Sequence, residues 1–403
     1  MIKRYLFSVI FLLLIAFSFA LAKEAESSPS TRVGGHFKYI YLDNEFGTRT
    51  VRNTSGTETA TTGQKNSGFT MNFISAYFNS AINNWISLTS FFTFYANSGA
   101  TASYGRAFGV SSKTSNTANL GYNATHSDVF AINLRLPDDY EAQLGMLFGK
   151  LTWDYGDLLS WEDTTLFSKF SCSAAAIHDS GIEVRKTYDL LGYSLPLTVQ
   201  IMNGAYRYVD GDQTLAFLGR VEPELGDFKF HLTGWKSNLS TGSSDFRYAT
   251  GIQYSNGPWY VRSEYTQTRQ SSERYLIAPG STTTNTTLAT ISDRDDKTYG
   301  GYYSVLKYQV SDWLKLEAMY YVYLANFMSS STAFSADALE KDEDIYLGAI
   351  FTVADGASIL VTYQFGNWTR TDSGVSSAVS AYSIYPYENL NYNRFLIGTR
   401  FTF

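Results

Sequence analysis

From about residue 33 onward the chain repeats one pattern, in which apolar side chains alternate with polar or small ones over about ten residues at a time. Between residues 314 and 324, Leu, Ala, Tyr and Val fill the even positions, whereas Lys315 and Glu317 fill odd ones. Between residues 227 and 235, Phe and Leu alternate in the same way with Lys229 and His231. Charges confined to one parity indicate β-strands with one apolar face, because a helix repeats with a different period.

The connections between these segments are alternately short and long. The short ones are rich in Asn, Asp, Pro and Gly, which are turn formers, and fall at 83–84, 137–139, 190–193, 223–226, 255–258, 311–312 and 355–356. The long ones are polar and span 43–68, 97–126, 151–178, 205–211, 237–245, 269–297, 326–342 and 367–391.

Seven short and eight long connections predict sixteen strands, with fourteen or eighteen as the alternatives. The predicted strands are 33–42, 69–80, 85–96, 127–136, 140–150, 179–189, 195–204, 212–222, 227–236, 246–254, 259–268, 298–310, 313–325, 343–353, 357–366 and 393–403.

Short turns at one rim and long loops at the other are typical of barrels that cross a membrane. We therefore expect an all-β fold, a transmembrane antiparallel β-barrel of about 16 strands with short periplasmic turns and long extracellular loops. A secreted β-solenoid or multi-sandwich protein is the soluble alternative. The last segment disfavours it, since Phe395, Ile397, Phe401 and Phe403 share one face and the chain ends on an aromatic residue.

The first residues predict secretion. A basic start at Lys3 and Arg4 is followed by an apolar stretch over 5–21 and by the small residues Ala20 and Ala22. This order and length are typical of a signal peptide. We expect residues 1–22 to be removed and residues 23–403 to form the barrel; an uncleaved anchor is the alternative.

Composition fits this interpretation and excludes some functions. Aromatic residues make up 16% of the chain and charged residues 17%, below the roughly 25% of soluble proteins. A single Cys excludes an intramolecular disulfide. The formal charge of −6, without basic blocks, predicts no nucleic-acid partner.

Catalytic and metal-binding patterns are missing from the sequence. The four histidines, at 36, 126, 178 and 231, show no metal-ligand spacing, and no nucleophile elbow, HExxH or phosphate-binding glycine loop occurs. We therefore expect no enzyme, no metal and no cofactor, with a Ser–His pair formed across strands at His231 as the alternative. Acidic runs at 293–296 and 340–344 are interpreted as solvated loop charge; divalent-cation binding or lipopolysaccharide bridging is the other possibility.

The leader, the sixteen-strand rhythm and the terminal segment Arg394–Phe403 together resemble the Gram-negative outer-membrane porins. The resemblance covers the whole mature chain. It implies an outer-membrane location, contact with lipid and lipopolysaccharide, and a homotrimer. It also implies that Phe401 and Phe403 form the signal read by the barrel-assembly machinery. In porins the third long loop folds into the barrel, and here that loop is 151–178, although it lacks the Pro-Glu-Phe-Gly type of signature.

A pore of this kind would be narrowed where the loop meets the wall. Strand parity places the candidate wall residues on the lumen side: Arg185, Arg220, Lys229, Arg262, Lys315 and Glu183. The candidate loop residues are Asp154, Asp157, Glu162 and Asp163, and Trp153 is among the aromatic residues expected to anchor the loop. Basic wall charges facing acidic loop charges would create a transverse field that filters solutes. Alternatively, the wall charges pair with one another.

Aromatic residues near strand ends predict the two girdles of a membrane barrel. They include Trp85, Trp235, Trp259, Trp313 and Trp368. A sugar-binding ladder of lumen tyrosines, such as Tyr260, Tyr321 and Tyr323, is the other interpretation of the aromatic content.

A sixteen-strand barrel leaves an aqueous channel. The leading functional hypothesis is thus a porin for passive diffusion of small hydrophilic solutes and ions. The alternatives are a solute-specific channel for an anion, an oligosaccharide or an amino acid, and a barrel that sheathes a partner such as a cytochrome in an electron conduit.

Overall fold

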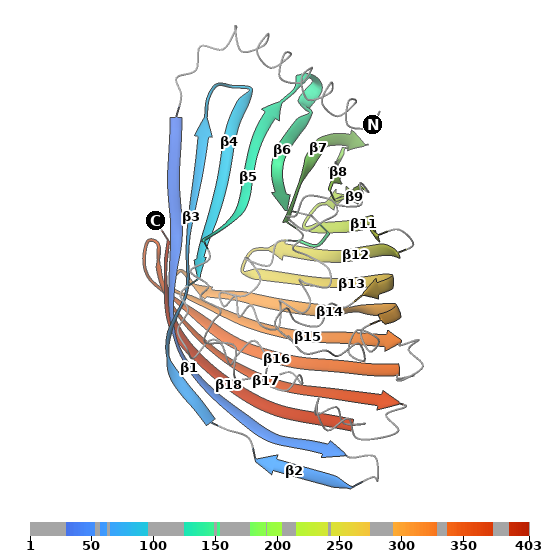
Figure 1. Cartoon of the computed structure of the whole chain (residues 1–403). Helices are drawn as coiled ribbons and strands as arrows, with labels where there is room; N and C mark the ends of the chain where they lie inside the picture. The colour runs from blue at the N-terminus through green and yellow to red at the C-terminus, as the bar shows by residue number, and fades with distance from the viewer. Residues whose placement is uncertain are drawn as a thin grey trace.

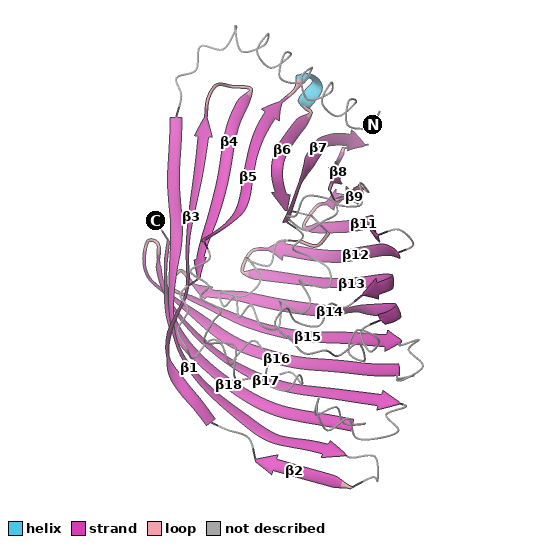
Figure 2. Ribbon diagram, in the orientation of Figure 1, coloured by secondary structure: helices cyan, strands magenta, loops and turns pink. Residues whose placement is uncertain are grey.

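One antiparallel sheet contains all the described strands. A computed structural model describes residues 30–52, 57–62, 65–95, 125–148, 151–153, 178–190, 192–203, 215–240, 243–274, 293–328, 337–373 and 387–402. Figure 1 shows the strands following one another around the sheet in chain order. In Figure 2 the described elements are strands joined by loops and turns, and the helical element drawn is the 3-10 turn Pro137–Asp139. No helix in the described part of the chain is long and apolar enough to span a membrane.

The strands fall close to the sixteen predicted segments, and each predicted segment coincides with one of them. Their bounds are β1 (Ser30–Arg52), β2 (Glu58–Thr62), β3 (Lys65–Ala81), β4 (Ile86–Tyr95), β5 (Thr125–Arg135), β6 (Glu141–Phe148), β7 (His178–Leu190), β8 (Tyr193–Met202), β9 (Ala216–Val221), β10 (Glu224–Leu225), β11 (Phe228–Ser240), β12 (Ser243–Asn256), β13 (Trp259–Arg274), β14 (Asp293–Ser311), β15 (Leu314–Met328), β16 (Asp337–Ala354), β17 (Ala357–Ser373) and β18 (Tyr387–Thr402).

The sheet closes on itself. β1 pairs with β3 on one side and with β18 on the other, and the remaining long strands each pair with their neighbours in sequence. Two of the eighteen strands are short: β2 pairs with the loop end of β1, and β10 continues the line of β9 after a break at Pro223. The other sixteen form the ring, which confirms the predicted barrel.

The seven predicted short turns lie at one rim. Because successive strands are antiparallel, alternate connections must share a rim. Ser30 at the start of β1 pairs with Ala81 beside the first of these turns. The Thr402 N–H, at the end of β18, donates to the Gly356 carbonyl in the last turn, 2.7 Å away. Both terminal strands therefore meet the short-turn rim, which requires an even number of strands.

Toward the opposite rim the strands run further than predicted. The prediction of a loop over 237–245 was wrong. β11 and β12 pair as far as Ser237 with Asp245, and they pair again at Ser240 with Ser243. The acidic runs at 293–296 and 340–344 lie in β14 and β16, not in loops. The physical reason is that alternation marks only the part of a strand that has one apolar side. Beyond it both faces are polar, while the backbone hydrogen bonds continue.

The two faces of the ring differ in chemistry. Large apolar side chains are exposed on the outer face, among them Phe217, Leu232, Phe246, Leu347 and Ile397. Charged and polar side chains of the opposite parity are buried on the inner face, among them Glu183, Arg220, His231, Arg247, Arg262 and Glu264. An apolar outside and a polar inside are the inverse of a soluble protein and match a barrel surrounded by lipid.

Three of the predicted girdle tryptophans lie on the inner side of the wall: Trp85, which lines a cavity there with Ser87 and Thr89, and Trp235 and Trp368. Trp259 and Trp313 are exposed on the outer face, as expected. Trp235 and Trp368 are only 2% and 1% exposed. Trp235 shares the parity of His231 on β11, so its side chain must point inward. The prediction failed because it weighed position near a strand end above parity.

Candidate functional site on the inner wall

The start of the third long connection lies inside the barrel. Leu151 is completely buried in an apolar cluster with Met202, Leu218 and Trp235, which come from β8, β9 and β11. The main chain of Thr152 accepts a hydrogen bond from Arg220 Nη1, 2.8 Å away. Residues 151–153 thus cross from β6 to the wall formed by β9, β11 and β13.

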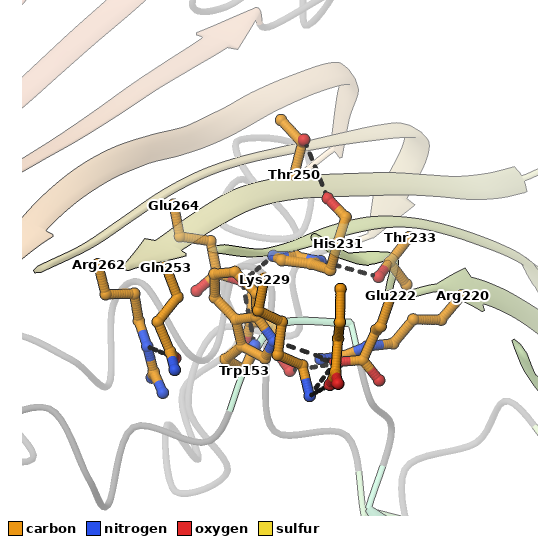
Figure 3. A network of polar contacts seen from close by, with 12 residues as sticks. Trp153, Arg220, Glu222, Lys229, His231, Thr233, Thr250, Gln253, Arg262 and Glu264 are labelled. Atoms are coloured by element: carbon orange, nitrogen blue, oxygen red, sulfur yellow. Dashed lines mark hydrogen bonds and ion pairs between the residues drawn. The ribbon is translucent and has the colours of Figure 1, made fainter. Parts of the chain in front are cut away.

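Trp153 makes hydrogen bonds and ring contacts with side chains of the wall (Figure 3). Its N–H donates to Glu264 Oε1 at 3.0 Å, and its indole Nε1 donates to Glu222 Oε1 at 3.0 Å. Its ring meets His231 edge-on, with centroids 4.3 Å apart, and the Arg262 guanidinium lies 5.2 Å from the ring centroid. The expectation that Trp153 anchors this loop to the wall agrees with these contacts.

Gly251 on β12 makes room for the indole. A Cβ atom at this position would lie 2.6 Å from the Trp153 ring and 2.7 Å from His231 Nε2. Any larger residue would collide with both rings, so the close fit of Trp153 against the wall requires glycine here.

Two of the basic wall residues near Trp153, Arg220 and Lys229, are paired with acids of the same wall, and Arg262 donates a hydrogen bond to Gln253 Oε1 at 3.2 Å. Arg220 Nη2 lies 2.6 Å from Glu222 Oε1. Lys229 Nζ lies 3.8 Å from Glu222 Oε1 and 3.1 Å from Glu224 Oε1. Figure 3 shows Arg220, Lys229 and Trp153 converging on Glu222. Positive and negative groups therefore alternate over a few ångströms.

His231 belongs to the same network. Its Nε2 lies 2.7 Å from Glu264 Oε1, and Tyr303 donates a hydrogen bond to Glu264 Oε2 at 2.5 Å. Its Nδ1 contacts Thr233 Oγ1 at 3.2 Å. The Glu264 carboxylate thus contacts the His231 ring, the Tyr303 hydroxyl and the Trp153 main-chain N–H, and His231 is part of this hydrogen-bonded wall.

The remaining predicted wall residues have no described contact with Trp153. Glu183 on β7 is buried, accepts a hydrogen bond from Gln200 Nε2 at 2.5 Å and pairs with Arg185 Nε. Lys315 is half-buried near the short-turn end of β15, in register with Ile350. The structure thus groups Arg220, Lys229 and Arg262 around Trp153. Arg185 lies in the register row of Arg220, with Thr198 of β8 between them, and Lys315 lies on the far strand β15.

The loop acids Asp154, Asp157, Glu162 and Asp163 lie outside the described residues. So does Phe403, the last residue of the predicted assembly signal. Phe401 is described: its side chain is 46% exposed on the outer face, and it pairs in register with Phe37 and Ala357.

A second inward network was not predicted. Asp342 and Asp344 are buried on β16, and Tyr392 donates a hydrogen bond to Asp344 Oδ1 at 2.5 Å. Gln364 Nε2 donates to the same oxygen at 3.0 Å and to the Tyr346 hydroxyl at 2.9 Å. Asp344 lies in the predicted strand 343–353 and shares the parity of Tyr346, so parity alone would have placed it inward; Asp342 would have followed if the predicted strand had begun earlier. Within the described part of the chain, no group of three or more His, Cys, Asp or Glu side chains is placed to hold a metal ion.

Comparison with known proteins shows similarity in structure only. No protein-family model matches the chain, and no curated protein matches it in sequence. OmpF of Salmonella typhi, in complex with daunomycin, has a TM-score of 0.55 at 13% identity, over 93% of this chain and 97% of that one. The outer membrane channel DcaP of Acinetobacter baumannii has a TM-score of 0.54 at 11% identity, over 94% and 99%. An anion-selective porin from Comamonas acidovorans has a TM-score of 0.50 at 11% identity, over 93% and 100%.

These similarities define the fold as the porin-type β-barrel of outer-membrane proteins. At such low identity they carry no functional residue from one chain to another.

Proposed function

We propose that this protein is an outer-membrane channel through which small hydrophilic solutes and ions diffuse passively. The observation that carries the proposal is the closed ring of sixteen strands with an apolar outside and a charged inside. Barrels of this strand number leave a water-filled passage, and buried charges on the inner wall suit solutes that travel with their hydration.

Residues 151–178 would narrow this passage. Leu151 and Trp153 attach the beginning of the segment to the inner wall, which supports an inward path for the residues after it. The wall side of the constriction would be Arg185, Arg220, Lys229, Arg262, Lys315 and Glu183, and the loop side would be Asp154, Asp157, Glu162 and Asp163. Because Arg220 and Lys229 are already paired with Glu222, we expect the wall to discriminate weakly between anions and cations.

Single-channel recording in planar bilayers tests the channel itself. A conductance that rises in proportion to salt concentration is the expected result for passive diffusion. Saturation together with block by micromolar concentrations of one solute would instead support a solute-specific channel. A refolded barrel that passes no current would contradict both, and co-purification of a haem protein would then support the electron-conduit alternative.

Assembly and targeting complete the proposal. Residues 1–22 would be removed as a signal peptide, and residues 23–403 would assemble as a homotrimer in contact with lipid and lipopolysaccharide, as the resemblance to porins implies. The N-terminal residue of the protein isolated from outer membranes and its mass in detergent solution test both points. Lys23 at the N-terminus and three times the protomer mass are the expected values.

A further inference from the structure

A cavity lies on the inner wall at the short-turn rim, outside the Trp153 network. It is formed by β4, β5, β6, β7 and the turn before β4, and its volume is about 370 Å³. Known small-molecule sites begin at roughly 300 Å³. The cavity is thus large enough for a single small solute.

Charges of both signs line this cavity and balance each other. Arg135, Glu141 and Arg185 occupy adjacent register positions on β5, β6 and β7, so their signs alternate along one row. Glu183 follows in the next row and pairs with Arg185. Two bases and two acids leave no net charge, so the cavity favours a solute without net charge over a simple anion or cation.

Asn133 holds two hydroxyl groups of the cavity lining in place. Its Nδ2 donates to Thr89 Oγ1 at 2.8 Å and to Ser87 Oγ at 3.2 Å, which fixes the orientation of the amide. Asn133, Ser87 and Thr89 all line the cavity. Together they place amide and hydroxyl groups in a fixed arrangement there, and such groups can exchange hydrogen bonds with a solute that carries hydroxyl groups.

Trp85 adds an aromatic ring to the cavity lining, beside the turn residue Asn84. An indole offers an apolar face and one N–H donor. Amides, hydroxyls, balanced charges and one aromatic ring together suit a molecule that has many hydroxyl groups and an apolar C–H face.

We infer that this cavity binds a neutral, polyhydroxylated solute of the mono- or disaccharide class at the short-turn mouth of the channel. The inference rests on the proposed channel function, to which it adds a solute class. A zwitterion fits less well, since each basic side chain of the cavity already has an acidic neighbour in register.

Calorimetric titration of the refolded barrel with glucose and with maltose tests the inference. Saturable binding of at least one sugar is expected, and Asn133→Leu should weaken it about tenfold, because the amide is lost at similar volume. The matched control is Asn256→Leu, which changes an exposed amide in a short turn elsewhere on the same rim. It should leave the dissociation constant unchanged within a factor of two.

A second pair of variants separates binding from misfolding. Trp85→Phe keeps an aromatic ring and should retain sugar binding, whereas Trp85→Ala should abolish it. Absence of sugar binding by the wild-type protein would overturn the inference, as would equal effects of the two Asn→Leu variants. Binding of glycine or glutamate in place of sugars would also overturn it. Ionic conductance, measured separately in bilayers, decides the proposed channel function, so the two can fail independently.

Discussion

Trp153 fastens the start of the third long connection by three kinds of contact. Its main chain and its indole each donate to a carboxylate, and its ring packs on His231 and Arg262. Only the second carboxylate bond, to Glu222, depends on the indole nitrogen. The contribution of the ring can therefore be separated from that of the hydrogen bond.

Replacing Trp153 should widen the passage. Trp153→Ala removes a buried ring, a change that costs about 3–5 kcal/mol in protein cores. We expect a higher single-channel conductance and a lower unfolding temperature. Trp153→Phe keeps an aromatic ring and loses the hydrogen bond to Glu222. Its single-channel conductance should therefore lie between that of the wild-type protein and that of Trp153→Ala. The exposed Trp313 provides the control, and Trp313→Ala should leave the conductance unchanged.

Glu222 determines the local charge balance, because Arg220, Lys229 and the Trp153 indole all converge on it. Glu222→Gln would leave two cations facing the passage with one acid fewer. We expect the reversal potential in a salt gradient to move toward anion preference. Glu224 is half-exposed at the rim and pairs only with Lys229 among the described contacts, so Glu224→Gln is the matched control and should give a smaller shift. If both variants gave the same reversal potential, Glu222 would not be the residue that sets the charge balance at the constriction.

Residue-scale prediction from sequence succeeded where parity governs orientation. The inward positions of Arg220, Lys229 and Arg262 follow from the alternation of their strands. Their partners do not, since Glu222 meets Trp153 across 69 residues of sequence and Glu264 meets it across 111. Such contacts depend on which strands of the barrel the third long connection reaches. The local pattern of apolar and polar residues does not contain that information.

At the scale of an element, the turn between β16 and β17 depends on Gly356. Its φ is +73°, and an added Cβ would lie 2.3 Å from the Thr402 carbonyl of β18. The conformation alone costs other residues roughly 1–2 kcal/mol, and here a backbone collision adds to it.

Gly356→Ala should consequently lower the urea concentration at which the refolded barrel unfolds. Gly226 also has a positive φ, +59°, but open space surrounds the position of its Cβ. Gly226→Ala carries only the conformational cost and should have the smaller effect. An equal loss for both variants would show that the contact with β18 contributes nothing.

Element boundaries were predictable only at the short-turn rim. Turns such as Gly257–Pro258 and Asp355–Gly356 carry turn-forming residues, and the strands end where these occur. At the other rim β16 begins at Asp337 rather than at 343, because hydrogen-bonded strands continue where both faces are polar. The acidic run 340–344 was interpreted as solvated loop charge, which is why Asp342, outside the predicted strand, and Asp344, within it, were not recognised as inward residues.

At the scale of the whole molecule, the C-terminal strand closes the ring. β18 pairs with β17 on one side and with β1 on the other, and both pairings reach the final described residues. The number of strands could be predicted because turns alternate in length along the entire chain. The pairing of β1 with β18 could not be read from either segment alone; it follows from the need to leave no open edge in lipid.

Deleting Phe403 should impair assembly into the outer membrane without changing the stability of the refolded barrel. The described pairing of β18 ends at Thr402, so the refolded variant should unfold at the same urea concentration as the full chain. If Phe401 and Phe403 carry the assembly signal, the amount of barrel in the outer membrane should fall several-fold. Phe365→Leu, a lipid-facing change on the neighbouring strand, is the control. Equal amounts of the deletion variant and the full chain in the membrane would argue against the signal.

The arrival of the first and last strands at the same rim has a further consequence. His36 on β1 and Thr402 on β18 are register partners, so a short linker could join the end of β18 to the start of β1. The chain could then be opened in any of the long connections without removing a strand pair. A circular permutant made in this way would have the same ring with a different order of synthesis. Comparing the refolding rates of the permutant and the parent would show whether the pairing of β1 with β18 limits closure of the ring, or whether the ring can close at any pair of strands.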